Sequence, residues 1–260
     1  MISTSYQAIG EICLIKQKDK KVAQAILDQY KRFKSVYYQG KISGQLRTPN
    51  VTWLAGERNT LAKVRENHCD FIVDISKVMF SKGNQAEKRR IVSQIKGSEE
   101  VLDMFAGIGY FTIPISKLTD ASVTAIELNN DSVDLLKHNI KLNKVEGQVN
   151  VIEGDSKVET LKLGKKFDRI LMGYFTSHKR SNASKLQSDL CSFPGTYEFL
   201  PVALKAAKKG AIIHFHELAA DSEEIISKIT SIASDLKVLN ARKVKKYGAQ
   251  THHWVIDIQV

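Results

Sequence analysis

"VLDMFAGIGYFTIPI", residues 101–115, is the stretch that decides the fold. An apolar run carries Asp103, and Gly107 and Gly109 follow it before a second apolar-periodic segment begins. Glycines directly after a strand allow a tight turn and a close approach of the backbone to a ligand. The third glycine of the dinucleotide-binding fingerprint would fall at Thr112, which weakens the case for a pyrophosphate ligand. The stretch therefore predicts a strand, a glycine loop and a helix.

Strands and helices alternate on both sides of this stretch. A helix opened by Asn84 precedes it, and Glu87 three residues on gives a pattern close to a capping box. The expected strands after the helix are 101–105, 122–128, 149–155, 167–174 and 211–218, and the expected helices are 108–118, 131–143, 196–207 and 222–236. This alternation predicts an α/β fold with a doubly wound, mostly parallel sheet. Residues 237–247 and 252–260 lack a long helix between them, so we expect them to pair antiparallel at the sheet edge.

The first 80 residues have a different pattern. Residues 6–16 are expected to form a strand and residues 21–34 a helix, and several short β-like pieces with turn residues follow. We therefore predict a small α+β domain over residues 1–80, with mostly antiparallel strands, and a second domain over residues 81–260.

Charge is distributed unevenly along the 260 residues, whose formal net charge is +11. Residues 1–100 carry 18 Lys and Arg against 10 Asp and Glu, and the remaining 160 carry 21 against 18. A concentrated basic surplus indicates a polyanionic partner such as a nucleic acid, although solubility alone explains it equally well. Three cysteines without C-x-x-C spacing, no basic leader and no long apolar run predict a cytoplasmic protein without a membrane span.

Three acids follow three successive strands: Asp103, Glu127 and Asp155. An acid after the second strand of such a sheet accepts hydrogen bonds from a ribose. Acids at all three positions suit a cationic nucleoside without phosphates, and S-adenosylmethionine is such a molecule. Glu127 and Asp155 could instead serve only as helix N-caps or turn residues.

A family resemblance is carried by FSKGNQAEKRRI, VLDMFAGIGYFTIPI, AIELNNDSVDLLKHNIKLN, EGDS and DRILMGYF. Over roughly residues 6–218 the chain resembles the tRNA family of guanosine-37 N1-methyltransferases and wybutosine-synthesis 3-amino-3-carboxypropyl transferases. The resemblance implies a class I methyltransferase Rossmann-like domain behind a small tRNA-contacting domain. In that small domain we expect five basic residues to contact the tRNA backbone: Lys31, Arg32, Lys34, Lys41 and Arg47.

The same motifs imply the site residues. Contacts with S-adenosylmethionine are expected from Phe80, Ser81, Asn84, Asp103, Phe105, Ala106, Gly107, Gly109, Glu127, Leu128, Asp155 and Ser156. Catalytic roles are expected for Gly173, Tyr174 and His216.

Two departures from the methyltransferase pattern indicate which group is transferred. The family's methyltransferases show an N-L-P type sequence after the fourth strand, whereas this chain has Met172-Gly173-Tyr174. They also tend to carry S-P-R where this chain has residues 81–83, SKG. Both departures point to transfer of the aminocarboxypropyl group to a wyosine precursor at guanosine 37. The alternatives are N1-methylation of that guanosine and a tRNA-binding module without strong activity.

Two further features have weaker interpretations. His214 and His216 share one face of a strand, but no cluster completes a metal site, so we expect no metal. The long segment 176–195 begins with the basic residues His178, Lys179 and Arg180, which could hold tRNA or simply be exposed to solvent.

Overall fold

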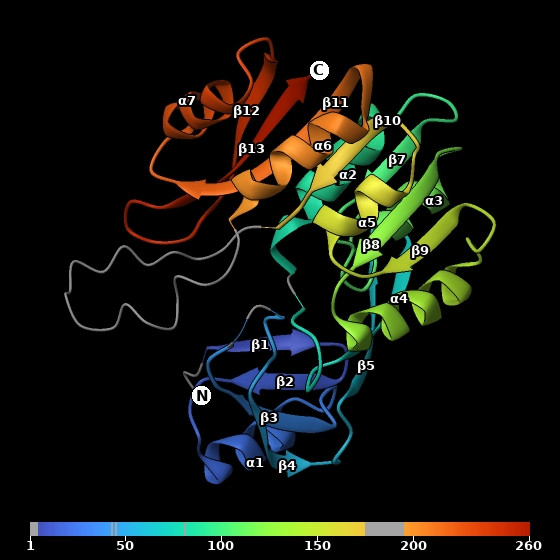
Figure 1. The fold of residues 1–260 in the computed structure, drawn as a ribbon. Helices are drawn as coiled ribbons and strands as arrows, with labels where there is room; N and C mark the ends of the chain where they lie inside the picture. The colour runs from blue at the N-terminus through green and yellow to red at the C-terminus, as the bar shows by residue number, and fades with distance from the viewer. Residues whose placement is uncertain (1–4, 43, 45, 81, 175–194) are drawn as a thin grey trace.

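The computed structural model describes residues 5–42, 44, 46–80, 82–174 and 195–260. Figure 1 shows a small sheet with one helix at the N-terminal end of the molecule and a larger sheet flanked by helices at the other end. This confirms the predicted α/β class, with a small α+β unit in front of a mostly parallel sheet. The predicted boundary between residues 80 and 81 stays a prediction.

The small leading sheet has the strand order β1-β2-β3-β4. Its elements are β1 (Tyr6–Ile9), β2 (Ile12–Ile15), α1 (Lys20–Gln29), β3 (Ser35–Gln39) and β4 (Val51–Gly56). Residues 6–16, expected as one strand, instead form a hairpin that turns at Gly10, whose φ is +53°. Helix α1 begins after Asp19, whose carboxylate accepts hydrogen bonds from the backbone of Lys21 and Val22, and ends earlier than expected.

A two-stranded sheet, β5 (Leu61–Glu66) and β6 (Cys69–Asp74), connects the leading sheet to the larger one. Asn139 and Asn143 of helix α4 (Asn130–Asn143) bond through their amides to the backbone of β6, at distances of 2.6–3.1 Å. One buried apolar cluster runs without a break from the leading sheet through β5 and β6 to α3 and α4. The leading sheet therefore packs into the same core as the glycine loop.

The larger sheet has the order β12-β13-β11-β10-β7-β8-β9. Its strands are β7 (Glu100–Asp103), β8 (Ser122–Glu127), β9 (Val149–Glu153), β10 (Phe167–Met172), β11 (Ala207–Ala219), β12 (Lys237–Lys246) and β13 (His252–Gln259). Strands β7 to β11 run parallel, and β13 pairs antiparallel with both β11 and β12. The expected antiparallel edge is thereby confirmed, and β13 lies inside it.

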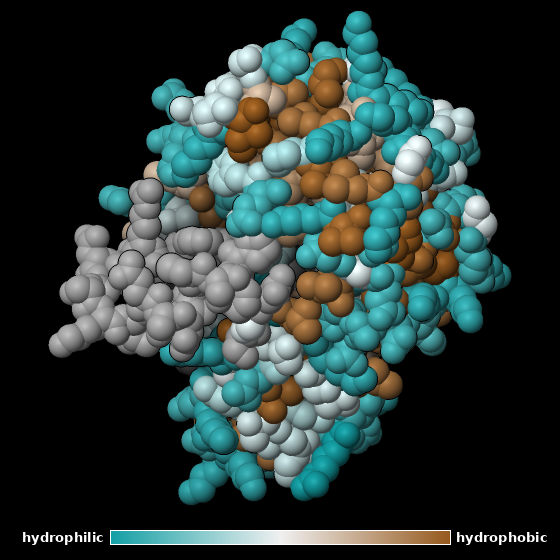
Figure 2. Space-filling model, viewed as in Figure 1, coloured by the Kyte–Doolittle hydropathy of each residue, from teal (hydrophilic) through white to brown (hydrophobic). Residues whose placement is uncertain are grey.

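Helices cover both faces of this sheet. One face carries α2 (Gln85–Gln94), α3 (Thr112–Leu118) and α4. The other carries α5 (Ser156–Lys162), α6 (Leu200–Ala206) and α7 (Ser222–Ile232), and short 3₁₀ turns η1 (Lys82–Asn84) and η2 (Thr196–Phe199) precede α2 and α6. Figure 2 shows hydrophilic residues over most of the drawn surface, with apolar residues gathered near α5 and α6. In the described part of the chain no helix is long and apolar enough to cross a membrane.

Candidate functional site

A cavity of about 220 Å³ opens at the carboxyl ends of β7, β8 and β10. The strand order reverses between β7 and β10, and ligands of doubly wound sheets bind at such a point. The predicted site residues that line this cavity are Asn84, Phe105, Gly107, Glu127, Leu128, Asp155, Ser156, Gly173 and Tyr174. These residues come from five separate segments of the chain, so folding assembles the site.

The glycine loop between β7 and α3 needs both of its glycines, for different reasons. Gly107 has φ +55° and lines the cavity, and a Cβ there would lie 3.0 Å from the Tyr110 ring. Gly109 has φ +99°, and a Cβ there would lie 2.6 Å from Ile113 and 2.9 Å from Leu136. Gly107 therefore shapes the cavity wall, while Gly109 allows the loop to pack against α3 and α4.

Glu127 is fixed at the end of β8 by the backbone. Its carboxylate accepts hydrogen bonds from the backbone N–H groups of Gly107 and Asn129, each at 2.8 Å. Burial raises the pKa of Glu127, and these backbone hydrogen bonds oppose the rise. Each carboxylate oxygen can accept a further hydrogen bond, so Glu127 can receive two hydroxyls of a ribose. Leu128, which is 40% exposed, adds an apolar wall beside it.

Asp155 and Ser156 form the third strand end of the cavity. Asp155 is the N-cap of α5, where its Oδ1 accepts a hydrogen bond from the Lys157 N–H at 2.7 Å. The capping role considered from the sequence is therefore real, but the residue also lines the cavity. The Ser156 hydroxyl donates to the Met104 carbonyl and ties α5 to the loop after β7.

Asp103 lies beneath the glycine loop and does not line the cavity. It is fully buried and accepts hydrogen bonds from the Thr112 hydroxyl at 2.8 Å and the Phe105 N–H at 3.4 Å. Burial raises the pKa of Asp103 to about 6, against the effect of these hydrogen bonds. The predicted direct contact with the cofactor is corrected here: Asp103 holds the loop in place from below.

Residues before α2 differ from expectation in one respect. Asn84 occupies the N-cap position but makes no side-chain capping bond, and Glu87 is instead bound to Arg90, so no capping box forms. Asn84 faces the cavity, where its amide can bind a ligand. Phe80 is buried against the Tyr110 ring, with the ring centroids 5.9 Å apart, and does not reach the cavity. Ser81 lies outside the described residues.

Ala106 and the end of β10 complete the predicted set. Ala106 is buried in the apolar core, and its N–H bonds to Ile126 O of β8, so it does not reach the cavity. Tyr174 stacks on Phe105, with centroids 5.0 Å apart and an interplanar angle of 26°. A Cβ on Gly173 would lie 3.3 Å from the Phe111 ring. The wall at β10 is thus aromatic and already tightly packed.

His216 does not reach the cavity, which corrects the predicted catalytic contact. Its ring is 1% exposed, lies edge-on to Phe111 at 5.6 Å and contacts the His253 ring nitrogen at 3.0 Å. Burial lowers the pKa of His216 well below its usual value. His216 belongs to the layer behind Phe111, because β11 lies one strand beyond β10.

His214 belongs to a buried charge network. Its Nδ1 lies 2.6 Å from Asp257 Oδ1 and its Nε2 lies 2.8 Å from an Arg169 nitrogen. Asp257 also binds Arg90 of α2 with both oxygens, at 2.6 and 2.9 Å. This network occupies both His214 ring nitrogens, and it fastens α2 to β13 behind the cavity.

Sequence reasoning missed a buried ion pair in the cavity wall. Lys88 of α2 donates to Glu66 of β5 at 3.0 Å, and both side chains are only 3% exposed. The Lys88 ammonium also lies 4.9 Å from the centroid of the Tyr110 ring. Burial lowers the pKa of Lys88, and the Glu66 carboxylate opposes this. The run EKRR suggests a solvated helix face, so no local signal identifies this pair.

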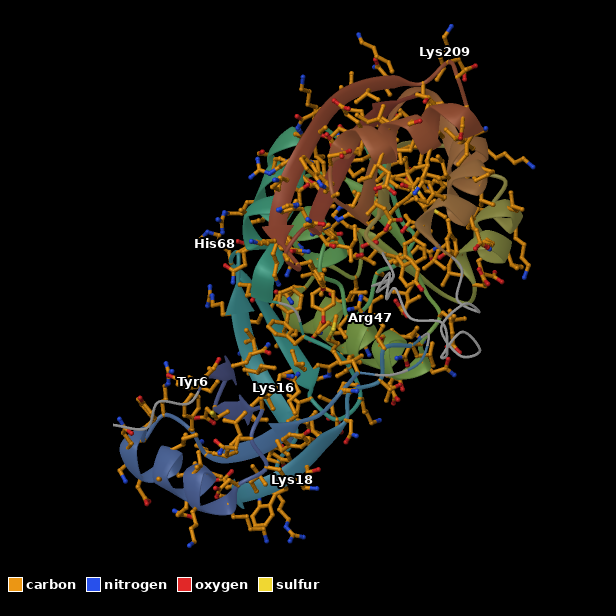
Figure 3. All side chains as sticks on the ribbon, turned by 90° about the vertical axis from the view of Figure 1, so that its left-hand side faces the viewer. Tyr6, Lys16, Lys18, Arg47, His68 and Lys209 are labelled. Carbon is orange, nitrogen blue, oxygen red and sulfur yellow. The ribbon has the colours of Figure 1, made fainter. Side chains whose placement is uncertain are left out.

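Arg47, expected from the sequence only as a contact to the tRNA backbone, lies at a position that the sequence does not predict. It lines the cavity from the segment between β3 and β4, and its φ of +54° is unusual for a side chain of its size. Figure 3 shows Arg47 where the leading sheet meets the larger domain. The segment 176–195, for which a role in holding tRNA was considered, lies outside the described residues except for Gly195.

The fold and the site together define a class I methyltransferase-like domain in which the acids Glu127 and Asp155 line the cavity at two strand ends. The comparisons agree: residues 62–183 match the TRM5/TYW2 methyltransferase domain and residues 1–60 match the TYW2 N-terminal domain. The chain belongs to the TRM5/TYW2 family.

Relatives of both branches are similar to this chain. The tRNA(Phe) (4-demethylwyosine(37)-C(7)) aminocarboxypropyltransferase of Methanocaldococcus jannaschii is 33% identical over 97% of this chain and 96% of its own length. The enzyme of the same name from Pyrococcus horikoshii is 34% identical over 87% of this chain and 77% of its own length. The P. horikoshii TYW2 structure in complex with MeSAdo has a TM-score of 0.79, with 29% identity, 98% of this chain and 90% of that chain covered.

The methyltransferase branch is nearly as similar in fold. The M. jannaschii tRNA m1G37 methyltransferase structure has a TM-score of 0.80 and 26% identity, and covers 98% of this chain but only 74% of its own chain. Fold similarity therefore does not separate the branches, and neither does the share of the relative's length, which is 77% for the P. horikoshii aminocarboxypropyltransferase.

Proposed function

We propose that this protein transfers the 3-amino-3-carboxypropyl group of S-adenosylmethionine to the wyosine-precursor base at guanosine 37 of tRNA-Phe. The supporting observation is that the chain matches an aminocarboxypropyltransferase over nearly its full length, including the TYW2 N-terminal domain at residues 1–60. The methyltransferase relative of Pyrococcus abyssi is 30% identical, against 33% and 34% for the two aminocarboxypropyltransferases. We place the protein in the cytoplasm, because Cys13 and Cys69 are buried free thiols.

The residues of the cavity fit S-adenosylmethionine. When bound, it supplies a sulfonium whose three neighbouring carbons are electrophilic. Glu127 is placed to accept the ribose hydroxyls, Asp155 and Leu128 flank the adenine position, and Asn84 offers an amide to the methionine end. The choice of carbon follows from which one the cavity holds in line with the acceptor. Gly173 and Tyr174 at the end of β10 shape the space for the acceptor base.

The assignment is tested by the sulfur by-product. The protein is incubated with S-adenosylmethionine and tRNA-Phe carrying the tricyclic precursor, and nucleosides and by-products are separated by mass. Aminocarboxypropyl transfer breaks the bond between sulfur and the methionine Cγ and leaves methylthioadenosine. If S-adenosylhomocysteine accumulates in step with modified tRNA, the protein is the guanosine-37 N1-methyltransferase instead. If neither forms, the chain is a tRNA-binding module without transfer activity.

Removing the Glu127 carboxylate should weaken cofactor binding. Glu127→Ala should cost about 1.5–3 kcal/mol of affinity, typical of a hydrogen bond to a charged group. Isothermal titration with S-adenosylmethionine measures this change, and Glu153→Ala at the exposed end of β9 is the matched control. Equal affinities of the Glu127→Ala variant and the wild type would contradict the ribose assignment.

A further inference from the structure

The outer edge of the larger sheet carries a dense row of positive charge. Strand β12 contains Lys237, Arg242, Lys243, Lys245 and Lys246, and no Asp or Glu occurs between Asp235 and Asp257. All five of these cations are exposed. The net charge of residues 101–260 is small because acidic residues on other elements offset the cations of β12.

A β-bulge directs part of this row toward the cavity. Arg242 pairs with Val255 and Lys243 with Trp254, but the register shifts so that Lys245 pairs with His253. Without the shift, the Lys245 side chain would lie on the same face of the sheet as that of Lys243. With the shift, it lies on the same face as Arg242. The Arg242 Nε lies 3.4 Å from the carboxylate of Glu87 in α2. Bulges commonly re-aim side chains next to active sites.

The end of β12 reaches the mouth of the cavity. Lys245 Nζ lies beside Gly83 of η1, where a Cβ would come within 2.9 Å of it. Its ammonium is also 5.4 Å from the centroid of the Tyr247 ring. Tyr247 is 43% exposed and lines the cavity. An exposed cation and an exposed aromatic ring therefore lie side by side at the edge of the cavity.

We propose that the end of β12 beside the cavity, residues 242–247, is a tRNA-docking surface of the catalytic domain, with Lys245 holding a phosphate next to the target nucleotide. The inference rests on the proposed function, in that tRNA is the acceptor. Lysine contacts with phosphate position a nucleic acid without reading its sequence, and exposed aromatic rings accept stacked bases. The competing explanation is that edge-strand lysines prevent edge-to-edge aggregation.

Lys237 provides a matched control on the same strand. By register it lies on the same face as Lys245, opposite Gln259, roughly 20–25 Å away along the strand. Gln259 bonds to Gly210, next to Lys209, and Figure 3 places Lys209 at the far end of the domain from Arg47. Protection of the sheet edge against aggregation would involve both lysines, whereas docking of tRNA beside the cavity would involve Lys245 alone.

The experiment measures equilibrium binding of a tRNA-Phe transcript at several salt concentrations. Lys245→Ala should reduce the slope of log affinity against log salt by about 0.7 to 0.9, the value for one lost phosphate contact. Lys245→Arg should keep the wild-type slope, and Lys237→Ala should leave it unchanged. Urea unfolding and gel filtration check that each variant folds and stays unaggregated.

Equal slopes for Lys245→Ala and Lys237→Ala would overturn the proposal, whether both slopes fall or neither does. Aggregation of both variants would assign the lysines to edge protection instead. The outcome is independent of the transferred group, because both rival activities act on guanosine 37 of tRNA. A wild-type protein that leaves S-adenosylhomocysteine would refute the proposed function while the slopes still decide the docking surface.

Discussion

Gly173→Val should reduce the transfer rate by about two orders of magnitude or more, because misplacing the reactants by about 1 Å can cost about 100-fold in rate. The affinity for the cofactor should stay within about threefold of the wild-type value. A Cβ at this position already lies 3.3 Å from the Phe111 ring, so the valine methyls must displace that ring or enter the cavity. In the proposed function the acceptor base approaches at this strand end. Glu127 and Asp155, which are proposed to hold the adenosine, follow other strands, and cofactor binding should therefore survive.

Two variants control this result. Gly173→Ala should give an intermediate loss, because only the Cβ is added. Gly147→Val adds the same bulk where no atom lies within 4 Å, so it should change neither transfer nor binding. Single-turnover transfer and titration with S-adenosylmethionine measure the two quantities separately. Full transfer by the Gly173→Val variant, or a parallel loss of cofactor affinity, would remove the acceptor role from this position.

Glu66→Leu should destabilise the protein by about 3–5 kcal/mol at neutral pH, because it leaves the Lys88 ammonium buried without its counter-charge. Burial already lowers the pKa of Lys88, so the unfolded chain binds more protons between the folded and unfolded pKa values. Stability of the variant should therefore rise as the pH increases through that window. Urea unfolding at pH 7 and at pH 9.5 measures both effects.

A double variant makes this prediction sharper. Glu66→Leu with Lys88→Met replaces the pair by apolar groups and should recover much of the lost stability. Lys77→Met breaks the exposed pair with Asp131, whose side chains are 52% and 47% exposed, and should change little because water replaces the contact. A double variant as unstable as Glu66→Leu alone would show that the pair does not act through charge compensation.

The order of the larger sheet could be predicted from the sequence because its signals are local. Apolar strands, the glycine loop around Gly107 and the acids that follow the strands fix the element types and bring Glu127 and Asp155 to one edge. Asp103 lies below the loop rather than at the cavity, because a strand-end acid can point below the loop as easily as toward a ligand. Only packing against Thr112 decides between the two.

Contacts between distant segments could not be predicted. The sequence EKRR is typical of a solvated face, yet Glu87 and Lys88 are both buried. Lys88 pairs with Glu66 of β5, and Glu87 pairs with Arg242 of β12 as well as with Arg90 of its own helix. His216 was expected in the site because its strand ends there, but β11 lies one strand too far from the cavity. The bulge that changes the face of Lys245 likewise cannot be predicted from the sequence, because it depends on how β12 pairs with β13.

The apolar cluster that joins the leading sheet to α3 and α4 affects which nucleotide of a bound RNA can reach the cavity. Because Ile12 and Leu14 share a core with Ile108 and Leu136, the leading sheet and the cavity are held at one separation before any RNA arrives. The entropy of fixing that separation is lost during folding and not again at binding. The protein can then select its nucleotide by that nucleotide's distance from an RNA stem bound at the leading sheet, as well as by the shape of the base.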